Sequence, residues 1–172
     1  MGFDSETAFE SALIKCLVEE KGWKDGVIKY PTEKDLLDNW AKIIFENNRD
    51  IDRLGDFPMT DGEMAQIMGQ IAKLRTPLNL NGFINGGTVQ IIRDNENDTH
   101  NFKKTISLKI FDRNEIAAGR TRYQIAQQPK FKAKNSIYPN RRGDFCLLIN
   151  VMPVIHVELK KSNVPVSEAQ YQ

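Results

Sequence analysis

The residue types that could do chemistry lie in two neighbouring strand patterns near the end of the 172-residue sequence. Asp144 begins one alternating apolar run, and Glu158 and Lys160 lie in the run that follows it. Successive side chains of a strand point to opposite faces, so the apolar residues of each run share one face and the charged residues share the other. The pattern therefore predicts that two carboxylates and an amine converge on one face of a hairpin.

The connection between the two runs decides whether Asp144 reaches Glu158. A three-residue loop, Val151-Met152-Pro153, keeps the two charged faces on the same side of the hairpin. A two-residue turn shifts the register and turns Asp144 away, unless a β-bulge near Asp144 restores it. Both alternatives are open at the level of sequence.

Two carboxylates a few ångströms apart suit Mg²⁺, which binds one or two carboxylates and completes its shell with water and phosphate oxygens. The metal can polarise a phosphodiester and acidify a bound water. Lys160 would orient that water or stabilise the developing charge. The alternative for these residues alone is a solvated strand face with an incidental ion pair. His156, on the same face as Glu158, is a candidate outer partner of the metal site, but we favour the alternative that it is packed or hydrogen-bonded locally. The two distant cysteines and two histidines give no zinc-ligand spacing.

The order Asp144, apolar strand, Val157-Glu158-Leu159-Lys160 resembles the D…ExK core of the PD-(D/E)xK nuclease superfamily. The longer string 140–161 is similar to the nuclease signature in the R (restriction and motor) subunit of type I restriction-modification enzymes. Three upstream blocks, 60–64, 107–112 and 127–131, resemble blocks of the same subunits. The resemblance covers nearly the whole chain.

This resemblance implies an α/β fold with a restriction-endonuclease-like core, in which a central mixed β-sheet is flanked by helices. We expect one nuclease domain, 1–172, with a helical part at about 4–76 and a sheet and active-site part at about 83–172. The implied function is Mg²⁺-dependent endonucleolytic hydrolysis of DNA. The implied partners are double-stranded DNA and the methyltransferase (M) and specificity (S) subunits. The chain has no G-x-x-x-x-G-K-S/T phosphate loop, so ATP is implied only for the motor domains of a parent subunit.

The same resemblance assigns roles to individual residues. Asp144 and Glu158 would be metal ligands, the backbone carbonyl of Leu159 a further ligand, and Lys160 the catalytic lysine. Gln172 falls where a Gln-x-x-x-Tyr element begins, with its Tyr beyond the last residue, so we expect the chain to be a piece of a longer subunit. Glu10, or Glu6, on the polar face of the first helix is a candidate auxiliary carboxylate.

Two positions depart from the family pattern. Gly143 stands where the superfamily signature has Pro, and Val151 stands where Gly is expected in the hairpin turn. The Pro supplies no ligand, so we expect its loss to affect backbone stiffness before Asp144 more than chemistry.

A basic run leads into Asp144, and its members are Lys130, Lys132, Lys134, Arg141 and Arg142. Such a run is usually a solvated loop. Beside a phosphodiester site, we expect it to contact DNA phosphates without selecting sequence. Arg120 and Arg122 would extend it.

The elements that must position these residues follow from hydrophobic period and capping signals. The sequence predicts helices over 5–21, 32–47 and from 60 toward Pro77. After Pro77 the apolar period changes from near four to two, which predicts strands over 88–92, 105–111, 122–127, 144–150 and 154–160. A further helix is expected from Ser167.

Composition narrows the class of protein. No apolar run approaches the roughly 18 residues of a membrane span. The net charge of +1 predicts binding neither to nucleic acid nor to a membrane surface. Two separated cysteines and a polar N-terminus predict a reducing compartment without a secretory signal, the cytoplasm. The resemblance to restriction enzymes implies that this cytoplasm is bacterial. Two alternatives stay open: a non-catalytic nuclease-fold module for DNA binding or subunit docking, and a stand-alone nuclease of the same superfamily.

Overall fold

The computed structural model describes residues 5–74, 76, 79, 88–110, 121–131 and 141–159. The chain divides into two compact units. The sheet unit comprises Met1–Leu36 and Arg122–Gln172, and the hairpin unit comprises Leu37–Thr121. Each is described by itself.

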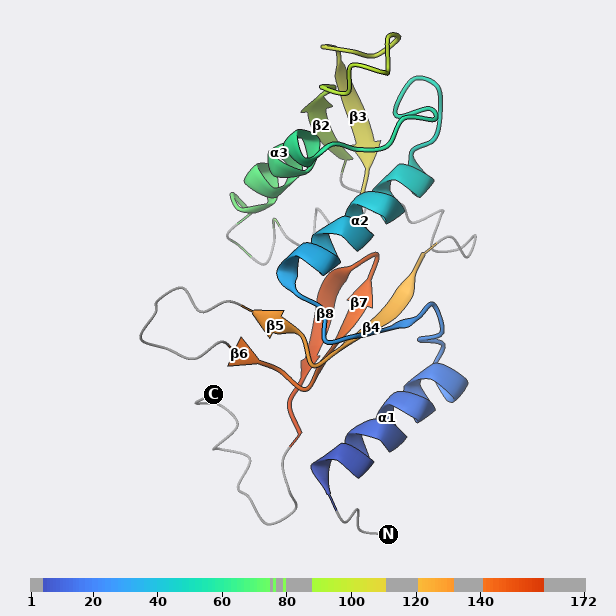
Figure 1. The fold of residues 1–172 in the computed structure, drawn as a ribbon, viewed down its shortest axis with the longest axis vertical. Coiled ribbons are helices and arrows are strands. Elements are labelled where there is room, and N and C mark those ends of the chain that lie inside the picture. Colours follow the sequence, from blue (N-terminus) through green and yellow to red (C-terminus); the bar gives the residue numbers. More distant parts are fainter. Residues whose placement is uncertain are drawn as a thin grey trace. The chain divides into compact units, whose positions relative to one another are not determined.

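A four-stranded mixed sheet organises the sheet unit, in the order β1-β4-β7-β8. Its strands are β1 (Val27–Lys29), β4 (Tyr123–Gln127), β7 (Phe145–Ile149) and β8 (Met152–Val157). β1 runs parallel to β4, whereas β7 is antiparallel to both β4 and β8. Figure 1 shows β4, β7 and β8 side by side, with the short strands β5 (Lys130–Phe131) and β6 (Arg141–Arg142) pairing beyond one end of the sheet.

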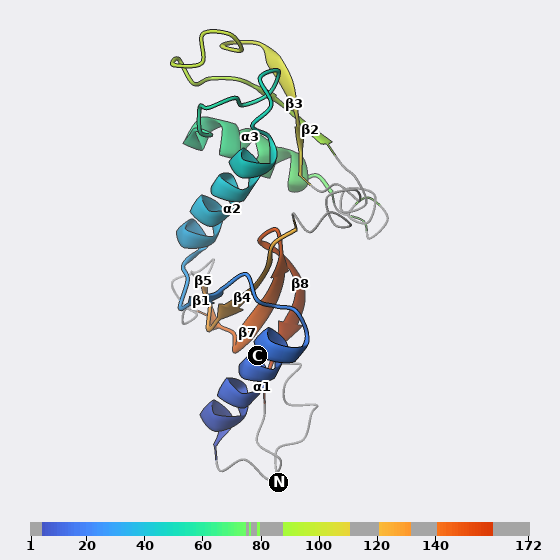
Figure 2. The same cartoon turned by 90° about the vertical axis from the view of Figure 1, so that its right-hand side faces the viewer.

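The helix α1 (Glu6–Glu20) packs against this sheet (Figure 2). It begins where the Ser5 hydroxyl oxygen accepts a hydrogen bond from the Ala8 N–H at 3.1 Å. It is followed by Gly22, whose φ of +81° suits a residue without a Cβ. The prediction of a helix over 5–21 is confirmed.

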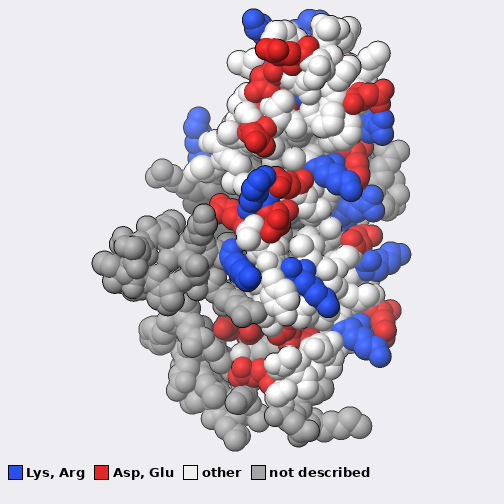
Figure 3. All heavy atoms as spheres, in the orientation of Figure 1, with Lys and Arg blue, Asp and Glu red and all other residues white. Residues whose placement is uncertain are grey.

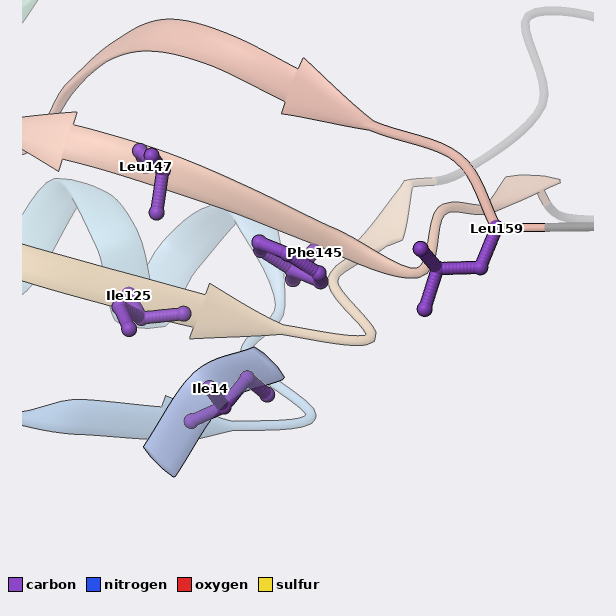
Figure 4. Close-up of a cluster of buried hydrophobic side chains, with 5 residues drawn as sticks. All are labelled: Ile14, Ile125, Phe145, Leu147 and Leu159. Carbon is purple, nitrogen blue, oxygen red and sulfur yellow. The ribbon is translucent and has the colours of Figure 1, made fainter. Parts of the chain in front are cut away.

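The core of the sheet unit joins α1 to the strands that carry the charged residues. Figure 4 shows its buried side chains: Ile14, Ile125, Phe145, Leu147 and Leu159. Ile125 and Phe145 are fully buried, and each such side chain contributes about 1.5–3 kcal/mol when it leaves water. Leu159 follows β8, so its burial anchors the chain just after the end of that strand.

The hairpin unit contains β2 (Thr88–Ile92) and β3 (Thr105–Lys109), paired antiparallel, with the helix α3 (Asp61–Ile71) beside them. Most of α2 (Glu33–Asn47) also belongs to this unit, because the boundary between the units falls within that helix. Both helices begin with reciprocal caps, Thr32 with Asp35 and Thr60 with Glu63, as the sequence predicts.

The free edge of β2 is covered by amide side chains of α3. The Gln66 side chain donates to the Ile92 carbonyl at 2.9 Å and accepts from the Ile92 N–H at 2.8 Å. The Gln70 side chain donates to the Gln90 carbonyl at 2.7 Å. Two glutamines one helical turn apart thus hydrogen-bond to an edge that would otherwise be open to another strand.

A buried ion network lies inside the hairpin unit. Arg93 donates through Nη1 to both carboxylate oxygens of Glu63, at 2.8 and 2.6 Å, and through Nε to Asp98 at 2.9 Å. All three side chains are at most 2% exposed. Burial alone would raise the pKa of Asp98, but hydrogen bonds from Arg93 and Asn101 together with the Arg93 charge outweigh it, so that pKa lies below its usual value.

Several elements differ from prediction. The third helix ends at Ile71, before Leu74 and Pro77. The last strand begins at Met152, so Met152 and Pro153 belong to β8 and the turn is Asn150-Val151. β1 was not predicted. The helix expected from Ser167 lies outside the described residues.

No helix in the described part of the chain has both the length and the apolar character that crossing a bilayer requires.

Candidate functional site

The β7–β8 hairpin uses the second of the two predicted registers. Its turn, Asn150-Val151, has two residues with φ of +47° and +67°, as a type I′ turn requires. A β-bulge between Leu147 and Leu148 then shifts the pairing, so that Phe145 faces Val157. Asp144 and Glu158 each lie one residue beyond this pair, Asp144 before β7 and Glu158 after β8, so they are at the same end of the hairpin. The strand predicted over 154–160 thus ends earlier, at Val157. The alternative of a three-residue loop is wrong. The two-residue turn shifts the pairing of the strands by one residue, and the bulge shifts it back.

The Asp144 carboxylate is tied to the segment that follows β8. Its Oδ2 accepts a hydrogen bond from the Leu159 N–H. The Asp144 carbonyl accepts one from the Gln128 N–H at 2.7 Å. Because the Leu159 side chain is 8% exposed and packs in the core, the backbone beside Glu158 is anchored next to Asp144. Lys160 and Gln172 lie outside the described residues.

His156 lies on the same strand face as Glu158. Its Nε2 is 3.9 Å from Glu158 Oε2, and its side chain is 59% exposed, so the ring is not packed in the core but lies beside the Glu158 carboxylate. Gly143 makes room for this ring: a Cβ at position 143 would lie 2.6 Å from His156 Nε2. The Pro of the superfamily signature carries a Cβ and would meet the same atom, so a residue other than Gly at this position would require the exposed His156 ring to move.

Glu10 is placed differently from the prediction. It is 4% exposed, not on a solvated polar face. Its carboxylate accepts hydrogen bonds from the Gln127 side chain at 2.7 Å and from the Gln128 side chain at 3.0 Å. These partners are more than a hundred residues away in the chain, so helical periodicity could not reveal them. The two glutamines, whose only signal is the Gln127-Gln128-Pro129 block, were missed as site residues.

The basic run is only partly described. Lys130 is exposed and begins β5, and its backbone pairs with Arg142 across the β5–β6 ladder while Phe131 pairs with Arg141. Lys132, Lys134 and Arg120 lie outside the described residues. Arg122 is at the other end of β4, where its N–H donates to Asn150 Oδ1 at 2.9 Å. Arg122 thus lies at the end of β4 away from Asp144, and its part in the basic run stays a prediction.

The donors beside Asp144 are chemically suited to a hard divalent cation. Asp144 and Glu158 supply carboxylate oxygens and Leu159 a backbone carbonyl, the donor types that Mg²⁺ prefers. Asp144 Oδ1 accepts no hydrogen bond within the described residues. No three His, Cys, Asp or Glu side chains in the described ranges are grouped as a metal-binding cluster. Burial raises the pKa of the neighbouring Cys146 thiol, which keeps it protonated.

The mixed α/β architecture, with a four-stranded mixed sheet, helix packing and a carboxylate hairpin at one sheet end, is that of a restriction-endonuclease-like core. Residues 4–172 match the family model described as type I restriction enzyme R protein N terminus, and the chain belongs to that family.

Curated relatives agree with this family. One is the type I restriction enzyme SsaAORF53P endonuclease subunit of Staphylococcus saprophyticus, 27% identical over 98% of this chain. Another is the SauCOLORF180P endonuclease subunit of Staphylococcus aureus strain COL, also 27% identical over 98% of the chain. The chain spans 16% of the length of each of these relatives.

Proposed function

We propose that this chain is the nuclease domain of a type I restriction enzyme R subunit and that it hydrolyses DNA phosphodiester bonds endonucleolytically with Mg²⁺. Membership of the family and the endonuclease names of its relatives support the class of activity. The observation that supports the proposal is the hairpin register, whose last pair, Phe145 with Val157, lies one residue from Asp144 and Glu158, together with the hydrogen bond from the Leu159 N–H to the Asp144 carboxylate.

In this proposal each residue of the hairpin has a separate task. A bound Mg²⁺ would polarise a phosphodiester and acidify a water. Asp144 and Glu158 would hold the cation, and the backbone carbonyl of Leu159, whose side chain is buried, would be a further ligand. Lys160 would orient the attacking water or stabilise the charge that develops on the phosphate oxygens. The bacterial partners would be double-stranded DNA and the M and S subunits, and ATP would act only through motor domains elsewhere in the parent subunit.

Metal titration of the 172-residue chain tests this proposal. We expect calorimetry to show Mg²⁺ or Mn²⁺ binding that Asp144→Asn and Glu158→Gln each weaken by more than about tenfold. Loss of a residue that hydrogen-bonds to a metal ligand typically weakens metal affinity about 10- to 100-fold, and loss of the ligand itself should weaken it at least as much. Glu19→Gln is the matched control, because Glu19 is an exposed carboxylate of the same unit.

Two results would contradict the assignment. One is equal metal affinity in all four proteins, and the other is no binding by the unmodified chain. The second result, combined with DNA binding, would favour the non-catalytic module.

A further inference from the structure

Three strand ends lie side by side at the end of the sheet that carries Asp144. The Tyr30 N–H, just after β1, donates to the Gln127 carbonyl at 2.8 Å, and the Gln128 N–H donates to the Asp144 carbonyl at 2.7 Å. Neighbouring strands are about 4.8 Å apart, so the Tyr30 backbone lies roughly 10 Å, two strand spacings, from that of Asp144. Tyr30 is therefore a close neighbour of the proposed site, although it is distant in sequence.

The Tyr30 side chain is exposed and paired with a cation. Tyr30 is 46% exposed, and Lys130 Nζ lies 5.9 Å from the centre of its ring. Lys130 is itself held in place, because its N–H donates to the Pro31 carbonyl at 2.8 Å and its backbone bridges to Thr32. An aromatic face and an ammonium group are thus presented together at the surface.

The backbone of Tyr30 is in a conformation that large residues rarely adopt. Its φ is +55°, in the left-handed region that favours Gly and tolerates Asn. A bulky residue retained there, beside a site, indicates a function for its side chain that outweighs the strain.

We propose that Tyr30 and Lys130 form a contact for one DNA strand next to the carboxylate hairpin. The Tyr30 ring stacks on a base that has left the duplex stack, and Lys130 contacts a neighbouring phosphate. Stacking on aromatic side chains accepts any base, and a single lysine contacts phosphate without selecting sequence. This inference rests on the proposed function in one respect, namely that the neighbouring hairpin cleaves the DNA strand that Tyr30 and Lys130 bind.

Strand binding by the 172-residue chain tests the contact. Fluorescence anisotropy is measured in EDTA with a labelled single strand of about 16 nucleotides and with the matching duplex. Tyr30→Gly should weaken single-strand affinity roughly 5- to 150-fold, the equivalent of one stacked base, and duplex affinity less. Tyr30→Phe keeps the ring and should retain binding. Lys130→Gln should lower affinity for both DNAs and reduce the salt slope by about one.

Stability separates this role from a structural one. Gly relieves the positive φ, so the thermal midpoint of Tyr30→Gly should equal or exceed that of the unmodified chain while binding falls. Tyr30→Asn repeats the test with a residue that also tolerates a positive φ but does not add the conformational freedom that Gly gives the unfolded chain. Lys103→Gly is the matched control: Lys103 also has a positive φ, +60°, and its ammonium lies 5.1 Å from the Phe102 ring centre. Its strand affinity should be unchanged.

Unchanged single-strand affinity in Tyr30→Gly, equal losses on single strand and duplex, or loss of binding in Tyr30→Phe would overturn the contact. So would an unmodified chain that binds neither DNA. Mg²⁺ titration of Tyr30→Gly should match the unmodified chain. Strand binding through Tyr30 without any Mg²⁺ binding would therefore remove the proposed hydrolysis and leave this contact standing.

Discussion

At the scale of single residues, the lack of a side chain at Gly143 leaves space for the His156 ring beside the candidate site. Gly143 directly precedes Asp144, and the space that a Cβ would take is occupied by the exposed imidazole of His156. The absence of a side chain at position 143 therefore sets where His156 lies relative to Glu158.

We expect Gly143→Ala to displace His156 from Glu158 at little cost in stability. The φ of Gly143 is not in the left-handed region, and an exposed ring can rotate away, so the unfolding free energy should fall by less than about 1 kcal/mol. Metal affinity in Gly143→Ala should then match that of His156→Ala. A double-mutant cycle checks this: the two changes should not add, and additive effects would show that Gly143 acts independently of His156.

Glu10 shows where sequence reasoning fails at this scale. Its position on the helix identified it as a candidate carboxylate, but not as a buried one, because Gln127 and Gln128 reach it from β4. Asp144 and Glu158 were placed on one face from alternation alone. The bulge that makes them meet has no local signal in the sequence.

At the scale of elements, the sequence predicts whatever is determined locally. Each of the helices α1, α2 and α3 begins at a Ser or Thr that hydrogen-bonds to a residue three positions further on. The strand β2 alternates between exposed and buried side chains. β1 has only Val27–Lys29, and its partner Ile125 is far along the chain, so no periodicity could reveal it. The hairpin unit is also held by a long-range feature, the pairing of Glu63 in the first turn of α3 with Arg93 after β2.

We expect Glu63→Gln to lower the unfolding free energy by about 3–5 kcal/mol. Gln can still close the capping box, but Arg93 would then be buried with one carboxylate fewer. Urea unfolding, followed by fluorescence of the buried Trp40 in the same unit, measures the change.

Asp56→Asn is the control for this comparison. It breaks the Arg49–Asp56 pair, whose side chains are 57% and 83% exposed, and it should cost less than about 1 kcal/mol. Similar losses in Glu63→Gln and Asp56→Asn would show that burial does not set the strength of the Arg93 network.

At the scale of the whole molecule, the net charge does not show where on the surface DNA would be attracted. Lys and Arg total 24 against 23 Asp and Glu, and Figure 3 shows both signs interspersed over one face. Any attraction to DNA must therefore come from particular groups such as Lys130, not from a general positive field. The chain also spans 16% of its curated relatives, so the parent subunit is the unit on which the proposed activity is finally measured.

Within a full-length subunit, we expect Lys160→Ala to abolish DNA cleavage and leave ATP hydrolysis nearly unchanged. This chain carries no phosphate loop, so nucleotide hydrolysis would reside in other domains, whereas Lys160 follows the Glu158-Leu159 pair of the proposed site. Parallel cleavage and phosphate-release assays measure both activities. Cleavage at the unmodified rate would exclude Lys160 from the chemistry, and equal loss of both activities would indicate misfolding.

The bulge at Leu147 and Leu148 also limits how this hairpin can change length during evolution. As long as the number of residues between Asp144 and Glu158 stays the same, the residue of β8 that the bulge leaves unpaired must lie either in the bulge or in the turn, because any other pairing would shift Glu158 out of register with Asp144. Gains and losses in this segment should therefore be inherited in compensating pairs. Among relatives, a three-residue turn should accompany an unbulged strand, and a two-residue turn should accompany a bulge.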